Sequence, residues 1–391
     1  MAFKFGANSV IGLTRNPNRT LDNIGGTSVP FNITTATFNN IDVYGAVRFR
    51  QAGKQLAQGG VGETFGIHIG GAYFPANQMG GWKRFSFITD SPAAVLSVNY
   101  ADALQPSYLG TGWSGMTYGL HHRGVAADTD RVGLTTVNRF PFSAVGSTGI
   151  QLSIANLSTG RFFQSAGGNG MQNNELGISV GGYITAPFIN ADNIETIPLT
   201  LSGEYSAIAA TLTPTTRYGA TMITNSSDAG FTMGGSRGPV SPATFLSTTT
   251  TSGITKYPFA SLTTSELWSS LTIARAAGGG VMSSTHGYSM AGLGPTIPIV
   301  TTTNNVEKFP FAASSPVAVA TASTPARGQS ATFSSRTTGF MLGGSTAATL
   351  APQPTNAHVL TNLKLPFASD TALATHATNP GTRSEERRVG K

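Results

Sequence analysis

The chain repeats a short segment in which a proline lies between large apolar residues. The clearest copies are Val-Glu-Lys-Phe-Pro-Phe-Ala-Ala at 306–313 and Ile-Thr-Lys-Tyr-Pro-Phe-Ala-Ser at 254–261. The last apolar residue of each copy is an anchor, and consecutive anchors are 52 to 60 residues apart: Phe31, Phe87, Phe142, Leu199, Phe259, Phe311 and Phe367. Seven copies at nearly one spacing indicate a repeat architecture, and such a repeat constrains the fold more than any local motif does.

Two further features recur in step with the anchors. An Arg, or Tyr108 in the second repeat, follows 16 to 21 residues later; these arginines are Arg48, Arg161, Arg217, Arg275 and Arg327. A run that alternates apolar and small residues then ends in a pair whose second glycine is Gly71, Gly182, Gly235, Gly292 or Gly344. Alternation at period two predicts a strand. The paired glycines indicate either backbone packed close to a neighbour or a turn that needs positive φ.

Each repeat therefore predicts four short strands: one headed by Arg, one that ends at the glycine pair, one that carries the proline, and a run such as 317–321. Four strands in about 56 residues, repeated in a ring, describe a β-propeller blade. The proline marks a bulge or a strand end, because it cannot donate to a sheet. The recurring arginines are expected to be structural, with guanidinium groups that bond backbone carbonyls.

The two ends predict a ring of seven blades with the last one split. Phe31 lies 17 residues before Arg48, and Arg383 lies 16 residues after Phe367, so each end supplies part of a blade. We expect residues 29–383 to form one all-β propeller, with six complete repeats and an incomplete seventh. Residues 1–28 are either an arm that docks on a partner or an extra strand. Residues 384–391 carry five charges and resemble vector read-through, so we set them apart.

The order of these residues resembles the kelch family of β-propellers. Asn304-Asn305-Val306, Phe309 and Arg327-Gly328 follow the family's order of Asn-x-Val, aromatic pair and Arg-x-Gly, and Asn193-Ile194 with Arg217-Tyr218-Gly219 does so too. The resemblance covers residues 29–383, although the family's Tyr-Asp is Phe-Pro or Tyr-Pro here and its Trp is mostly a small apolar residue. The Phe-Pro-Phe-Ala-Ser version also resembles repeats of bacteriophage and environmental viral structural proteins.

Composition excludes several classes of protein. The chain has no cysteine, which excludes disulfides, thiolate metal sites, cysteine nucleophiles and a tyrosine–cysteine copper centre. The net charge of +7 is spread without a basic run, which argues against nucleic-acid binding. No run of 18 apolar residues or signal peptide is found, so we expect no membrane span and a location in a virion or in host cytoplasm during assembly. No cofactor is expected.

Candidate chemistry is sparse along the chain. His68 and His286 fit structural or surface positions in strands. His121, His122 and Arg123 are expected in a loop near Asp128 and Asp130, where a divalent cation is an alternative reading, although the spacing matches no known metal loop.

The loops between each glycine pair and the next anchor are the better candidates for binding. These loops should emerge on one face, beside the loops that lead into each Arg strand, and insertions on one face of a repeat ring mark a binding face. The alternative is that they are solvent-filling spacers. The candidate binding residues on this face are Tyr73, Phe74, His121, His122, Arg123, Phe188, Arg237, Phe245, Ile297 and His358.

Two functions remain open at this point. The first is a non-enzymatic binding or structural module, a component of a viral particle that holds a protein or glycan on the long-loop face and assembles into something larger. The second is a polysaccharide hydrolase or lyase with a pair of carboxylates at the central channel. An intracellular adaptor would need an attached domain, and none is visible.

Overall fold

A computed structural model of the chain describes a set of strands and the turns that join them. The chain divides into two compact units, Met1–Ala52 and Gly53–Lys391, and each is considered by itself. The described residues are 2–5, 9–12, 65–69, 72–73, 77–78, 81–86, 94–99, 107–108, 110–114, 118–122, 124–126, 133–141, 151–161, 170–173, 175–184, 189–191, 193–199, 206–211, 217–225, 228–237, 249–262, 265–294, 302–314, 318–323, 326–328, 330–335, 337–344, 346, 361–369 and 374–378.

In the first unit the described residues form one hairpin of β1 (Ala2–Phe5) and β2 (Ser9–Gly12). The predicted boundary at residue 28 lies outside the described residues.

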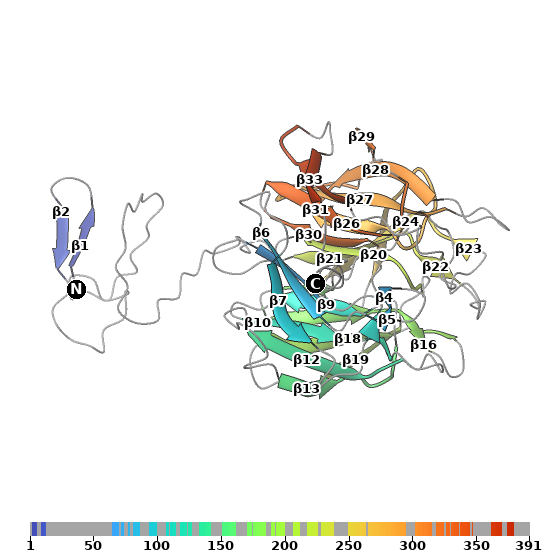
Figure 1. Ribbon diagram of the computed structural model, residues 1–391, viewed down its shortest axis with the longest axis horizontal. Coiled ribbons are helices and arrows are strands. Elements are labelled where there is room, and N and C mark those ends of the chain that lie inside the picture. The colour runs from blue at the N-terminus through green and yellow to red at the C-terminus, as the bar shows by residue number, and fades with distance from the viewer. Residues whose placement is uncertain are drawn as a thin grey trace, which may run out of the picture. The chain divides into compact units, whose positions relative to one another are not determined.

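In the second unit, five sheets have four strands and one has three among the described residues, and all are antiparallel (Figure 1). The first three sheets in chain order are β3 (Phe65–Ile69), β6 (Gly81–Ser86), β7 (Ala94–Asn99); β9 (Thr111–Ser114), β10 (Tyr118–His122), β12 (Thr136–Pro141), β13 (Gln151–Asn156); and β14 (Met171–Gln172), β15 (Leu176–Val180), β18 (Asn193–Pro198), β19 (Ser206–Thr211).

The other three sheets follow the same pattern. They are β20 (Thr221–Asn225), β21 (Ala229–Met233), β24 (Gly253–Pro258), β25 (Glu266–Ser270); β26 (Gly279–Met282), β27 (His286–Leu293), β28 (Thr302–Pro310), β29 (Ala318–Ser323); and β30 (Ala331–Ser334), β31 (Thr338–Leu342), β32 (Thr361–Pro366), β33 (Ala374–Thr378). The strands of each sheet come from one repeat in chain order, so one repeat of the sequence makes one sheet.

Short two-stranded ribbons extend several of these sheets. They are β4 (Ala72–Tyr73) with β5 (Asn77–Gln78), β8 (Ser107–Tyr108) with β11 (Val125–Ala126), β16 (Tyr183–Ile184) with β17 (Ile189–Asn190), and β22 (Ser236–Arg237) with β23 (Thr249–Thr250).

Proline ends the third strand of the sheet wherever it occurs there. Pro141, Pro198, Pro258, Pro310 and Pro366 are the last residues of β12, β18, β24, β28 and β32. At that position the missing N–H leaves no gap in the ladder. Of the two readings that the sequence allowed, a strand end is therefore the correct one.

Consecutive sheets lie against each other through their first strands. Strand β14 contacts β9 and β20, and β26 contacts β20 and β30. Side chains join these strands: the backbone N–H of Gln172 donates to Thr224 Oγ1 (3.0 Å), and the N–H groups of Gly280 and Met282 donate to the hydroxyls of Thr332 (3.2 Å) and Ser334 (2.9 Å). The first strand of one sheet thus satisfies backbone donors of its neighbour.

The apolar core lies between consecutive sheets. One cluster joins Ile223 and Phe231 of β20 and β21 to Met282 and Phe309 of β26 and β28. The other three clusters likewise take residues from two neighbouring sheets. No sheet buries its faces alone, as expected for stacked repeats.

In four of the second strands, β15, β21, β27 and β31, a glycine receives a side chain from the preceding sheet. A Cβ on Gly287 would meet Ile223 of the preceding sheet and the ring of Phe309 of its own sheet. The same relation holds between Gly177 and Trp113, Gly230 and Met171, and Gly339 and Val281. Here glycine is required by close approach, because any side chain would push two sheets apart.

The described part of the chain is therefore all-β with a β-propeller-like arrangement, and its described residues include no helix. The described residues therefore contain no helix that could cross a membrane.

Candidate binding face

In three of the repeats, among the described residues, two kinds of long connection lie together. One leads from the last strand of a sheet into the next sheet, and the other joins the second strand to the third. Tyr108 of the first kind pairs with Val125 of the second, and Tyr218 pairs with Ser236, and Ala276 with Leu293, in the same way. We call the surface that these paired connections form the long-loop face.

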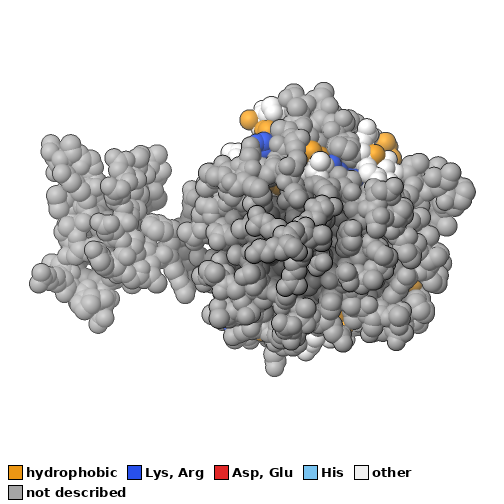
Figure 2. Space-filling model, in the orientation of Figure 1, with side chains coloured by type: hydrophobic (Ala, Val, Ile, Leu, Met, Phe, Trp, Pro, Cys, Tyr) orange, Lys and Arg blue, Asp and Glu red, His pale blue; other side chains and the backbone are white. Residues whose placement is uncertain are grey.

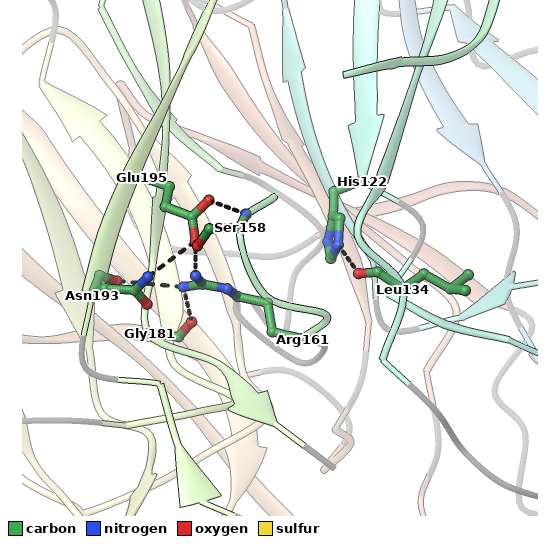
Figure 3. Close-up of polar contacts among 7 residues, drawn as sticks. All are labelled: His122, Leu134, Ser158, Arg161, Gly181, Asn193 and Glu195. Atoms are coloured by element: carbon green, nitrogen blue, oxygen red, sulfur yellow. Dashed lines mark hydrogen bonds and ion pairs between the residues drawn. The ribbon is translucent and has the colours of Figure 1, made fainter. Parts of the chain in front are cut away.

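A buried arginine holds the base of this face in four consecutive sheets. One terminal nitrogen, Nη1, of Arg217 donates to the carbonyl oxygens of Gly234 (2.6 Å) and Gly253 (2.7 Å). Arg275 donates likewise to Ala291 and Asn305, and Arg327 to Gly343 and Thr361. Figure 3 shows Arg161 reaching Gly181 and Asn193. Each arginine fastens the end of the second strand to the start of the third.

Two of these arginines also meet a buried carboxylate. Arg161 pairs with Glu195, and the same carboxylate accepts from the N–H and the hydroxyl of Ser158, both at 2.8 Å (Figure 3). Arg275 pairs with Glu307, which accepts from the N–H (2.7 Å) and hydroxyl (2.9 Å) of Thr272. Both ion pairs are buried, and each carboxylate is held by a guanidinium, a backbone N–H and a hydroxyl, which favours a stable buried charge.

The other two arginines meet a threonine instead. Arg217 donates to the hydroxyl of Thr255, which occupies the place of Glu195 and Glu307, and Arg327 donates to the hydroxyl of Thr361. Among the described residues, the guanidinium of Arg217 has no carboxylate partner, so its positive charge is not compensated there.

The glycine pairs turn the chain away from the sheet and contact the next one. Both members have positive φ at 181–182, 234–235 and 343–344, and in the variant pair Ala291 (φ 53°) and Gly292 (φ 124°) do so as well. The N–H of Gly182 donates to the carbonyl oxygen of Arg217 (3.1 Å), which belongs to the following sheet. The two readings of the glycine pairs, a positive-φ turn and close backbone packing, are both correct.

Burial changes the acidity of the arginines without removing their charge. Burial lowers the pKa of Arg275 and of Arg327 to about 10. Burial is also the main cause that lowers the pKa of Arg217 to about 10, and repulsion from Arg237 adds to it. All three guanidinium groups remain cations at neutral pH.

The expectation of a histidine loop was wrong. His121 and His122 lie in strand β10 and are 7% and 0% exposed, so they are core residues and do not project from a loop. Nε2 of His122 lies 2.7 Å from the carbonyl oxygen of Leu134, and because that oxygen only accepts, Nε2 carries the proton (Figure 3). No group of three metal-ligating side chains occurs among the described residues, and Arg123, Asp128 and Asp130 lie outside them.

The second repeat also needs a correction in register. From the spacing of the other repeats we also expected Gly119 to close the glycine-pair strand of the second repeat, but it lies inside β10 opposite Phe140. The positive-φ glycine of this repeat is Gly124 (φ 76°), which occupies the place of Gly182 and Gly235.

Of the other predicted binding residues, the structure describes Arg237 fully. It lies on ribbon β22–β23, is half-buried, and pairs with the exposed Thr249. Tyr73 lies on β4, although its side chain is outside the described set. Also outside the described residues are Phe74, Phe188, Phe245, Ile297, His358 and the structural positions Arg48, Gly71, Phe87 and Phe142.

Acidic side chains are scarce in the described part of the chain. They are Glu175, Glu195, Asp228, Glu266 and Glu307. Two of these, Glu195 and Glu307, form ion pairs with buried arginines. In the view of Figure 2, Lys or Arg atoms lie beside apolar ones, and no acidic atom is visible among the coloured residues.

Comparison with known proteins gives a fold and no family. No model of a known protein family matches the sequence, and a search of curated proteins finds no match. The solved structure titled "Structure of YjhT" is similar, with a TM-score of 0.60 and 9% sequence identity, over 83% of this chain and 97% of that one. At this identity the similarity concerns the fold alone.

Proposed function

We propose that the chain is a non-enzymatic binding module whose long-loop face holds a partner, and that it serves as a component of a phage or other viral particle. The paired connections on that face carry the binding part of this proposal. They vary in length from repeat to repeat, whereas the sheets beneath them keep one pattern of arginine, glycine pair and proline. Variable loops on a constant scaffold are how repeat rings bind their partners.

The use of charge supports binding over catalysis. Glu195 and Glu307 are the buried carboxylates of the described residues, and each is saturated by an arginine and a hydroxyl-bearing residue. A glycoside hydrolase needs two carboxylates roughly 5 to 10 Å apart and open to substrate. The viral setting follows from the resemblance of the repeats to viral structural proteins.

We propose further that the ring has seven blades, six of them the described sheets and the seventh assembled from segments near both ends. In the competing arrangement the six described sheets close into a ring by themselves. Deleting residues 1–52 separates the two. A seven-blade ring would lose its closing strands and much of its thermal stability, whereas a ring of six would melt as the full chain does.

The binding proposal is tested with the full chain and with variants that have shortened connections. Purified protein is screened against glycans and against structural proteins of the same particle, with melting temperature as the measure of folding. We expect binding that is lost when the connections on the long-loop face are shortened while the melting temperature stays unchanged. Binding that survives shortening would refute the proposal, and release of reducing ends or unsaturated sugars from polysaccharides would establish the enzyme instead.

A further inference from the structure

The sheet β20–β21–β24–β25 carries more uncompensated positive charge on the long-loop face than its neighbours. Its buried arginine, Arg217, meets Thr255, whereas Arg161 and Arg275 meet carboxylates in the sheets on either side. A second cation, Arg237, lies near enough to repel Arg217. No described carboxylate pairs with either cation, so the two create a local positive potential in a partly buried setting, where charge is weakly screened.

The hydrogen-bond donors of the Arg237 side chain have no acceptor in the described part of the chain. Its side chain is half-buried, its Nε is buried without an acceptor, and neither a hydrogen bond nor an ion pair is found for it among these residues. Thr249, its cross-strand partner, is exposed, and the hydroxyl of Thr251 nearby is buried without a partner. A buried guanidinium donor without an acceptor is costly, and the cost falls when an anion supplies the acceptor.

The scaffold does not need a cation at this position. The residues two places after the second glycine in the other repeats are Tyr73, Ala126, Ile184, Gly294 and Thr346, none of which is charged. A residue that kept the fold together would be expected to recur with the repeat, as Arg161, Arg217, Arg275 and Arg327 do. The sheet therefore does not require the charge of Arg237, which is available to a partner on the long-loop face.

We propose that Arg237 on ribbon β22–β23 binds a carboxylate of an acidic peptide segment on a partner protein, with Thr249 beside the contact. The inference rests on the proposed binding function and names the chemistry of one part of the long-loop face. The planar guanidinium fork matches a carboxylate with two parallel hydrogen bonds. Among the described residues, two aromatic rings lie beside this ribbon: Tyr218, which pairs with Ser236, and Tyr183, which packs against Tyr218. They are 0% and 2% exposed and offer no face on which a sugar could stack, which favours a peptide.

The test measures binding of a labelled Glu-Gly repeat peptide to the full chain by fluorescence anisotropy, with a Gln-Gly peptide of equal length as the neutral probe. Arg237→Gln is compared with Lys308→Gln, which removes one positive charge from strand β28. We expect Arg237→Gln to weaken binding about tenfold or more, Arg237→Lys to weaken it less, and Lys308→Gln to change it less than about twofold. The melting temperature of each variant confirms folding.

Several outcomes would overturn the inference. Equal losses in Arg237→Gln and Lys308→Gln would mean nonspecific attraction, and absence of Glu-Gly binding would remove the site. Binding of a polyuronate but no peptide, dependent on Arg237, would show that the ligand is a glycan. If shortened connections abolish partner binding while Arg237→Gln leaves it unchanged, the proposed function stands and this inference fails.

Discussion

The backbone N–H of Gly235 donates a hydrogen bond to the carbonyl oxygen of Arg275, with the two atoms 2.8 Å apart. Gly235 follows β21, the second strand of one sheet, and Arg275 precedes β26, the first strand of the next. Gly182 with Arg217 and Gly292 with Arg327 repeat the contact. The guanidinium of each arginine bonds carbonyl oxygens of its own sheet, and its backbone carbonyl accepts from the preceding sheet. One residue therefore stabilises both its own sheet and the contact with the preceding sheet.

Replacing Gly234 by Ala should disrupt this boundary. Gly234 has φ +63°, and a Cβ there would meet the carbonyl oxygen of Arg275, which is backbone and cannot move aside. We expect a loss of about 2–4 kcal/mol in the free energy of unfolding, measured by urea denaturation. The control is Gly253→Ala, whose Cβ would meet no backbone: it would lie 3.2 Å from the end of the Leu267 side chain and 3.9 Å from Nη2 of Arg217. Similar losses in both variants would contradict the prediction.

A second prediction concerns the side chain that enters each glycine. Gly287→Ala should cost about 1–3 kcal/mol, because the added methyl meets Ile223 and the Phe309 ring. Ile223→Ala alone should cost about 2–5 kcal/mol through the cavity that it leaves. In the double variant the new methyl occupies part of that cavity, so the combined loss should be smaller than the sum. A double-mutant cycle measures this coupling, and strict additivity would show that the two residues act independently.

The positions of the strands could be predicted from the sequence because the patterns that mark them are local and recur from repeat to repeat. Alternation within a few residues, a proline and a glycine pair each have one physical meaning wherever they occur. Arg161 and Arg217 could be found for the same reason, since they recur at a constant distance from the anchors.

The contacts of the buried arginines could not be found in the same way. Glu195 and Glu307 occur in two repeats only, and Thr255 takes their place in another, so spacing gives no signal. Their bonds to Ser158 and Thr272 join residues 37 and 35 apart, which local patterns do not show. His121 and His122 were misplaced because consecutive polar residues are typical of loops, whereas here the strand buries them.

The pair of Arg275 and Glu307 provides a third prediction. Glu307→Gln leaves the guanidinium buried without a counter-charge, so we expect a loss of about 3–5 kcal/mol in the free energy of unfolding. Glu266→Gln is the matched control, because Glu266 pairs with Lys256 at 3.0 Å with its side chain 53% exposed. Exposed pairs contribute about 0–1 kcal/mol. Chemical denaturation of both variants decides the matter, and a small effect at Glu307 would mean that the buried pair is not needed.

The last prediction supplies the carboxylate that Arg217 lacks. Thr255 occupies the place of Glu195 and Glu307, and its hydroxyl accepts from Arg217. Thr255→Glu should recreate the ion pair of the neighbouring sheets, while Thr255→Gln adds a side chain of nearly the same size without charge. We expect the Glu variant to be more stable than the Gln variant by about 1.5–3 kcal/mol, the range for hydrogen bonds to charged groups. Thermal and urea unfolding of the two proteins measure the difference. Equal stability, or a less stable Glu variant, would show that the hydroxyl already satisfies Arg217 and that desolvating a new carboxylate outweighs the attraction.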